Sequence, residues 1–260
     1  MIYLKTDEEI ELMRVSNLLV GKTLAEVAKA IKPGVSALDL DKIAFDFIKS
    51  NGAEPSFLGY NGFPNTLCIS INDVVVHGIP SNYVLKEGDI VSVDCGVKKN
   101  GFHGDSCYTF CCGEVAPETR SFLKTVKESL MKGIEVAVEG KRIGDIGNAI
   151  QTNCESAGYS VVREMVGHGI GRNLHEEPAV PNYGKASYGK GLKSGMVIAI
   201  EPMINMGAKE VYLAEDQWGI YTADKSLSAH YEHTVAIRRG EADILSSFEY
   251  IEQLLGSKSI

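Results

Sequence analysis

The chain has 260 residues, of which 44% are hydrophobic and 23% charged, and a formal net charge of −8. This length suits one large domain or two small ones, and the composition excludes disordered, collagen-like and coiled-coil proteins. The acidic balance argues against nucleic-acid binding, no apolar run approaches the roughly 18 residues of a transmembrane helix, and the first residues lack the apolar stretch of a signal peptide.

Local signals predict four helices and several short strands. A capping box begins at Thr6, so a helix is expected from about residue 7 to about 31, before the break at Pro33. Ser36 caps a second helix that ends near residue 50, with Gly52 just beyond it. The remaining elements are helices at about 117–138 and 143–156, a turn at 99–101, and strands at 67–71, 74–76, 90–93, 102–110, about 159–166, 197–200 and 234–238.

This order of helices and strands occurs twice. Segment 85–94 matches segment 192–201, and glycines and an aspartate upstream of each match at nearly the same offset. Chance explains one short match but not several in the same order, so an internal duplication is inferred. We therefore expect one domain over residues 1–260, with α+β halves at about 6–115 and 116–240 and a tail at 248–260.

The repeat brings four carboxylates into register, because Asp94 matches Glu201 and Asp105 matches Glu232. Each lies in or beside an apolar strand, where acids are disfavoured and seldom buried without a partner. A single acid at a strand end is usually a turn residue, but four converging acids would repel one another unless cations lay between them. Carboxylates with one imidazole favour divalent Mn, Fe, Co or Zn, and two such ions sharing carboxylates would lie roughly 3–4 Å apart.

Three histidines are positioned to serve the carboxylates or the substrate. His168 lies between glycines directly after an apolar strand, and the glycines allow close backbone approach. His77 and His175 lie at strand-to-loop junctions, where groups that contact substrate commonly occur.

The other three histidines lie close in sequence to the matched carboxylates. His103 and His230 each lie two residues before a carboxylate, which makes them either supports for the ligands or satisfied polar residues. His233 should face away from Glu232 and be structural.

Rival motifs lack their required context. Six cysteines contain no Cys-x-x-Cys pair, which favours idle thiols over a zinc ribbon or a disulfide framework. The glycines at 167, 169 and 171 give a weak dinucleotide signal that no amphipathic helix follows. A Walker A stretch, a second histidine at the zincin spacing and a serine or cysteine nucleophile signature are all missing.

Longer motifs resemble those of the type I methionine aminopeptidases of the bacterial kind, and the resemblance covers the chain from Thr6 to about Arg239. It implies the pita-bread fold, in which two pseudo-symmetric α+β halves surround a central antiparallel sheet. The motifs are Cys68-Ile69-Ser70-Ile71-Asn72, His77-Gly78-Ile79-Pro80, Asp94-Cys95-Gly96, Gly104-Asp105, Gly167-His168-Gly169-Ile170-Gly171, Glu201-Pro202 and Ser226-Leu227-Ser228-Ala229-His230-Tyr231-Glu232-His233-Thr234.

The resemblance implies two divalent metal ions. Asp105 and Glu232 match the ligands that bridge the two ions, Asp94 a ligand of the first, and His168 and Glu201 ligands of the second. His77 and His175 match the histidines that contact substrate and steady the tetrahedral intermediate. The backbone carbonyls of three residues match a monovalent-cation site found in some members: Asn72, Val74 and Ser228.

The methionine pocket follows the family only in part. Tyr60, Cys68 and Trp218 match positions that line or rim it. Phe57 replaces a common cysteine, Phe63 a common tyrosine and Leu174 a common phenylalanine, so the shape of the pocket departs from that of many relatives.

The implied activity is metal-dependent removal of the N-terminal methionine from nascent proteins and peptides with a small second residue. A hydroxide bridging the metals would attack, with Glu201 accepting or relaying its proton, His175 stabilising the oxyanion and His77 bonding to the peptide nitrogen. A cytoplasmic monomer with no membrane association and a possible ribosome contact is expected. The alternatives are an Xaa-Pro aminopeptidase-like enzyme and a non-catalytic binding module of the same fold.

Overall fold

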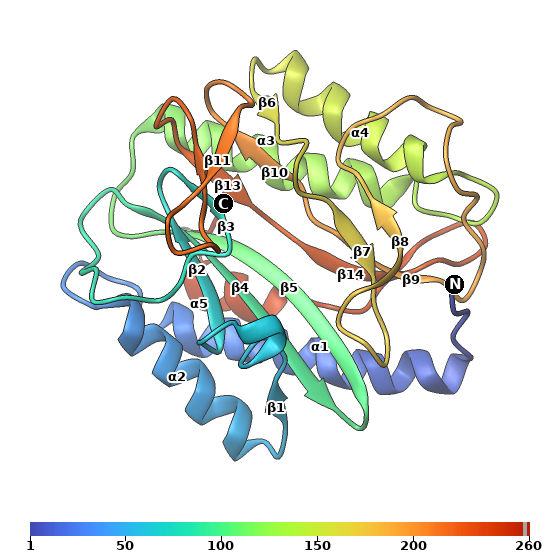
Figure 1. Cartoon of the computed structure of the whole chain (residues 1–260), viewed down its shortest axis with the longest axis horizontal. Coiled ribbons are helices and arrows are strands. Elements are labelled where there is room, and N and C mark those ends of the chain that lie inside the picture. The colour runs from blue at the N-terminus through green and yellow to red at the C-terminus, as the bar shows by residue number, and fades with distance from the viewer. Residues whose placement is uncertain (257–258) are drawn as a thin grey trace.

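The computed structural model describes residues 1–256 and 259–260, and it has the expected α+β architecture. Figure 1 shows α1 and α2 on one side of the strands, and α3 and α4 on the other. The helices are α1 (Asp7–Ala28), α2 (Ala37–Ser50), α3 (Pro117–Glu135), α4 (Ile143–Ser156) and α5 (Glu249–Leu255), with a 3-10 turn at Tyr60–Gly62.

Antiparallel pairing joins the strands into four sheets within the described residues. In one sheet β4 (Ile90–Lys99) pairs with β1 (Glu54–Pro55), β2 (Leu67–Ile71) and β5 (Phe102–Cys111). A second sheet runs β15 (Asp243–Ile244), β14 (His233–Ala236), β9 (Val197–Ile200), β7 (Gly167–Gly169) and β8 (Glu176–Val180). A third sheet contains β13 (Ser228–His230), β10 (Met203–Asn205) and β6 (Ser160–Val161), in that order. The fourth contains β11 (Val211–Leu213), β12 (Ile220–Thr222) and β3 (Val74–Val76), in that order.

The predicted helix starts are confirmed. Thr6 and Ser36 each accept a bond from the backbone N–H three residues on, and the acids at those positions return it, so both helices begin with capping boxes. Helix α1 ends at Ala28, before the predicted residue 31, because its last turn tightens into bonds from Ala30 to Val27 and from Ile31 to Ala28 ahead of the proline. Likewise α3 ends at Glu135 rather than near 138.

The strand at about 159–166 was predicted too long. Only β6 forms there, and Val162 donates one further bond to the carbonyl of Met203. The register then places Pro202 opposite Arg163, and proline has no N–H to continue the ladder. In contrast β4 and β5 extend beyond their predicted bounds, because Asn100 and Gly101 form the predicted turn with positive φ and join them as a long hairpin.

Hydroxyl groups connect β5 to the last strands of the chain. Ser106 and Thr109 donate to the carbonyls of Glu232 and His230 at 2.7 Å, and Thr234 donates to the carbonyl of Asp105 at 2.8 Å. All these hydroxyls are buried, so each must have a partner. The bonds hold the segment around Glu232 directly against the strand that carries Asp105.

The tail packs back onto the body. Phe248 is buried, with its ring 4.9 Å from that of Tyr108 and stacked 3.9 Å from that of His233, and α5 lies against α1. Of the tail predicted at 248–260, residues 257 and 258 lie outside the described part of the chain. None of the described helices combines the length and apolar character that crossing a membrane requires.

Candidate active site

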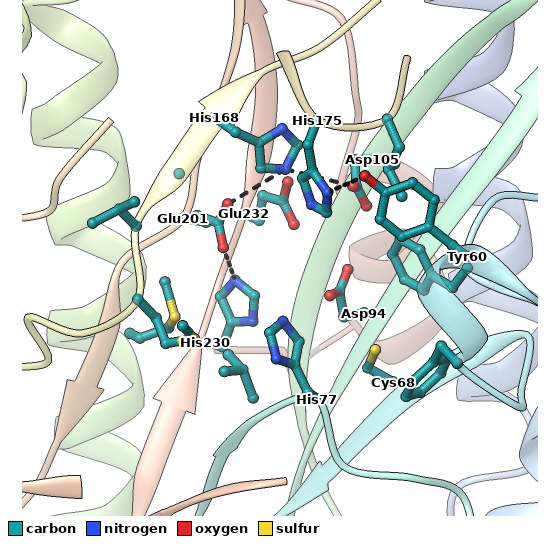
Figure 2. Close-up of a pocket in the computed structure, with 18 of the residues that line it drawn as sticks. Tyr60, Cys68, His77, Asp94, Asp105, His168, His175, Glu201, His230 and Glu232 are labelled. Carbon is teal, nitrogen blue, oxygen red and sulfur yellow. Dashed lines mark hydrogen bonds and ion pairs between the residues drawn. The ribbon is translucent and has the colours of Figure 1, made fainter. Parts of the chain in front are cut away.

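A pocket of about 420 Å³ lies between the two larger sheets, and its floor is acidic while its walls are mainly apolar. Figure 2 shows the labelled side chains pointing into it from different elements. All four matched carboxylates line this pocket, together with four of the six histidines: Asp94, Asp105, Glu201, Glu232, His77, His168, His175 and His230.

The carboxylates reach the floor from strands that are remote in sequence. Asp94 and Asp105 lie on the paired strands β4 and β5, Glu201 follows β9 directly, and Glu232 lies between β13 and β14. The nearest ligand atoms of Asp105, His168 and Glu232 lie within 4.8 Å of one another, which is close enough to hold one metal ion. Glu201 joins this group through its Oε1, 3.6 Å from Nε2 of His168.

Burial alters the proton affinity of every one of these acids. It raises the pKa of Asp94 to about 7, and it raises the pKa of Glu201 well above its ordinary value, with further increases from Asp94 and Asp105. The pKa values of Asp105 and Glu232 are also raised by burial first and by neighbouring carboxylates second. With raised pKa values, the carboxylates of such a cluster retain protons when no cation is bound, and they are all ionised only beside cations.

His168 is suited to act as a neutral ligand. Burial lowers its pKa to about 3, with a smaller contribution from His175, so the imidazole is uncharged at neutral pH. Its Nδ1 lies 2.9 Å from the carbonyl of Gly169, which leaves Nε2 facing the carboxylates. A Cβ on Gly167 would lie 2.4 Å from the carbonyl oxygen of Ala199, and one on Gly169 would lie 2.3 Å from that of Glu177. The flanking glycines therefore permit the close strand packing that positions this ring.

Several polar atoms at the floor lack a hydrogen-bond partner. Within the described residues, these buried atoms include Oδ1 of Asp94, Oδ1 of Asp105, Oε1 of Glu232 and Nε2 of His230. An unpaired buried carboxylate oxygen costs free energy, and a divalent cation is the group that satisfies several such oxygens at once. The donor set of carboxylates and one imidazole thus fits a resident divalent metal.

His230 contributes more than its place in the sequence indicated. Its Nε2 lies 3.6 Å from Oε2 of Glu201, on the side of that carboxylate opposite to His168 (Figure 2). Burial lowers its pKa to about 3, so the ring is neutral. Because 3.6 Å is too long for a hydrogen bond and Nε2 is buried without a partner, His230 is not the satisfied polar residue of the two alternatives.

His77 and His175 both line the pocket, at the strand-to-loop junctions where the sequence placed them. His77 has a φ of 59°, a conformation that L-residues seldom adopt and that often marks functional positions. His175 places Nδ1 2.9 Å from the hydroxyl of Tyr60. Burial lowers the pKa of both histidines, so both rings are neutral hydrogen-bonding groups at neutral pH.

His103 and His233 do not face the pocket. His103 places Nδ1 2.8 Å from the hydroxyl of Ser56, which makes it the satisfied polar residue of the two alternatives. His233 places Nδ1 2.6 Å from the hydroxyl of Ser246, in agreement with its predicted structural role. All six cysteines are free thiols, as expected.

The apolar wall holds every residue that was assigned to the methionine pocket. Phe63 and Trp218 meet edge to face at 5.1 Å, and Cys68 is buried beside them. The wall also contains residues that the sequence did not single out, because apolar strand residues carry no signal that separates a pocket wall from the core. These are Val76, Met165, Val166, Ala179 and Met203.

The residues assigned to a monovalent cation lie close together at the end of β2. Ser228 donates its backbone N–H to the carbonyl of Asn72 at 2.8 Å, and Val74 begins β3 two residues further on. The side chain of Asn72 is held by Asp89.

Comparison with known proteins identifies the family. Residues 11–239 match the pattern of metallopeptidase family M24. A methionine aminopeptidase of Clostridium acetobutylicum is 52% identical over 250 residues, which span 96% of this chain and all of that protein. The crystal structure of methionine aminopeptidase from Rickettsia prowazekii superposes with a TM-score of 0.94 at 41% identity, covering 95% of this chain and 100% of the other. The chain belongs to the methionine aminopeptidases of metallopeptidase family M24.

As a family M24 metallopeptidase, the chain has the pita-bread fold, and the expected fold class is confirmed. Prolidase from Pyrococcus furiosus shares this fold with a TM-score of 0.78 at 25% identity, but this chain covers only 66% of it. The closer likeness in both sequence and length is therefore to the methionine aminopeptidases, and the carboxylate floor is the candidate metal cluster of a metallopeptidase.

Proposed function

We propose that the chain removes the N-terminal methionine from peptides and nascent proteins whose second residue is small. The observation that supports this function is the convergence of partnerless carboxylate oxygens at the floor of an otherwise apolar pocket. Full-length identity of about 50% to methionine aminopeptidases agrees with it.

Two divalent ions are proposed, with Co, Mn, Fe or Zn as the candidates. Asp105 and Glu232 would serve both ions, Asp94 the first, and His168 and Glu201 the second. When bound, such ions supply Lewis-acid chemistry and lower the pKa of coordinated water from 15.7 to about 7.

The protein side chains then perform the proton transfers and the orientation of substrate. Glu201 accepts the proton of the attacking water, and Nε2 of His230 lies 3.6 Å from the same carboxylate. Because Tyr60 holds Nδ1 of His175, its Nε2 is free to donate to the oxygen of the scissile carbonyl as negative charge develops there. His77 hydrogen-bonds to the peptide nitrogen, and the proton that Glu201 took from the water passes to that nitrogen as the C–N bond breaks.

Specificity follows from the shape of the pocket. The wall around Phe63, Cys68, Leu174 and Trp218 accepts an unbranched thioether side chain, and the acidic floor attracts the ammonium group of a free N-terminus. Aromatic groups at the opening, including Tyr60, leave little room for a large second residue.

Further properties complete the proposal. The protein acts as a cytoplasmic monomer, a single catalytic domain of two duplicated halves, with a monovalent cation held by the carbonyls of Asn72, Val74 and Ser228. The buried core that extends through elements of both halves supports the single domain. Contact with the ribosome would suit an enzyme of nascent chains.

The decisive experiment compares two peptides on chelated enzyme after metal is added back. Met-Ala-Ser should release methionine with each of Co, Mn, Fe and Zn in turn, whereas Ala-Pro-Ser should remain uncut. Preferential cleavage of Ala-Pro-Ser would reassign the chain to the Xaa-Pro branch. A lack of cleavage of either peptide by metal-loaded protein would favour the binding module instead.

A further inference from the structure

The loop that carries His175 is tied to the N-terminal segment of the chain. The loop runs from Ile170 to His175, between β7 and β8. A buried ion pair, called the tie below, connects the residue that follows the loop to Lys5. Nζ of Lys5 lies 2.7 Å from Oε2 of Glu176, and each side chain is only 5% exposed. A buried pair this close holds its geometry firmly, because moving either partner would leave a charge without compensation.

The second oxygen of Glu176 fixes the turn of the loop. Oε1 accepts the backbone N–H of Asn173 at 3.2 Å, and the carbonyl of Asn173 in turn accepts the N–H of Gly171 at 3.1 Å. The carbonyl of Gly171 accepts the N–H of His103 from β5 at 2.9 Å. Glu176 therefore fixes the conformation of the turn, and the ion pair with Lys5 fixes the side chain of Glu176.

Gly171 supplies an independent observation. A Cβ at this position would lie 2.6 Å from Cε of Lys5 and 2.7 Å from Oε1 of Glu176. The space that this glycine leaves is filled by the ion pair itself. Gly171 is the third glycine of the 167–171 motif. Neither dinucleotide binding nor the metal cluster explains a glycine at this position, whereas the ion pair between Lys5 and Glu176 requires the space.

Lys5 is itself held in place. Its backbone N–H donates to the carbonyl of Gly195 at 2.7 Å, directly before the capping box that begins α1. Glu9, the acid of that capping box, pairs with Arg172 of the loop at 3.1 Å. The loop is thus bound to α1 through Arg172, and through the adjoining Glu176 to Lys5 just before that helix.

We propose that Lys5 and Glu176 are positioning residues for His175, acting through the turn at 171–176. This inference rests on the proposed function insofar as it concerns catalysis, since His175 is the group aimed at the substrate. A displacement of about 1 Å in such a group lowers a rate by as much as 100-fold. The effect should fall on kcat rather than KM, because the contact strengthens only as charge develops.

The main test replaces both charges with apolar side chains. The double variant K5M/E176M leaves no buried charge unpaired, so its melting temperature should stay close to that of the wild type. Its kcat on Met-Ala-Ser should nevertheless fall by about 10–100-fold with little change in KM. K127M is the control, because it breaks the partly buried pair between Lys127 and Glu252, neither of which lines the pocket, and should leave kcat unchanged.

A cycle with H175A separates positioning from a general structural role. If the tie acts through His175, K5M/E176M should change kcat no further once that ring is gone. An equal loss of kcat in both backgrounds, or a wild-type kcat in the folded double variant, would overturn the proposal.

Hydrogen exchange of segment 170–176 tests the tie without any assay of cleavage. Exchange should be faster in K5M/E176M than in wild type or K127M, and unchanged exchange would contradict the inference. Release of methionine by the wild-type enzyme reports on the proposed function separately, so the failure of one is distinguishable from the failure of the other.

Discussion

The rings of His168 and His175 meet edge to face, with their centroids 4.3 Å apart and their planes at 83°. One ring presents Nε2 to the carboxylate floor, while the other is held by Tyr60 in the pocket wall. The group that would hold a metal and the group that would face the substrate are therefore in contact. A shift of the loop that carries His175 changes both.

Removing the hydroxyl of Tyr60 should weaken catalysis modestly. Y60F keeps the aromatic ring beside His175 but loses the bond to Nδ1, so the imidazole is no longer fixed in one orientation. A neutral hydrogen bond of this kind contributes about 0.5–1.5 kcal/mol, so kcat should fall about 2–13-fold. Steady-state kinetics on Met-Ala-Ser check this, and a larger effect on KM than on kcat would contradict the assigned role.

Removing a floor carboxylate should abolish activity and reduce the pH dependence of stability in the metal-free protein. E232A should lower kcat/KM by more than about 100-fold, since even groups that only support metal ligands are worth 10–100-fold. Elemental analysis should show less bound metal than in wild type. The melting temperature of the chelated variant should also fall less between pH 5 and pH 8 than that of chelated wild type, because one of the acids whose pKa burial raises is gone.

His77 should matter for turnover and not for metal content. H77A removes the ring proposed to face the leaving peptide nitrogen, and loss of one such polar group typically costs about 100–1,000-fold in kcat. The variant should bind as much metal as wild type, because His77 lies outside the ligand cluster. A parallel loss of metal would show that the residue supports the floor instead.

The stabilisation that metal gives should increase with pH. The folded-state pKa values of the four acids are raised above their unfolded values of about 4, so the metal-free protein binds extra protons and loses stability as pH rises above about 4 and through the pKa of Asp94, about 7. A bound cation replaces those protons. The difference in melting temperature between metal-loaded and chelated enzyme should therefore be larger at pH 8 than at pH 5. At about 2–4 °C per kcal/mol it should grow by several degrees. A difference independent of pH would contradict the raised pKa values.

Local sequence signals were sufficient to predict many of the helices and strands. Capping residues such as Thr6 and Ser36 predict helix starts because a cap and its partner lie within one turn. The strand predicted beyond Val161 does not form, because Pro202 on the partner strand ends the ladder there. The residues around position 163 carry no information about that partner, so the local sequence could not predict the end of the strand.

The sequence by itself identified the carboxylates and His168 as candidate metal ligands, because acids at matched strand positions in the two halves are recognisable without a structure. It also determined the family, through motifs that run along nearly the whole chain. Only the tertiary structure decided which atoms meet: Lys5 with Glu176, Tyr60 with His175, and His230 with Glu201. The physical reason is that contacts between residues far apart in the chain depend on strand register and loop placement, which no local spacing encodes.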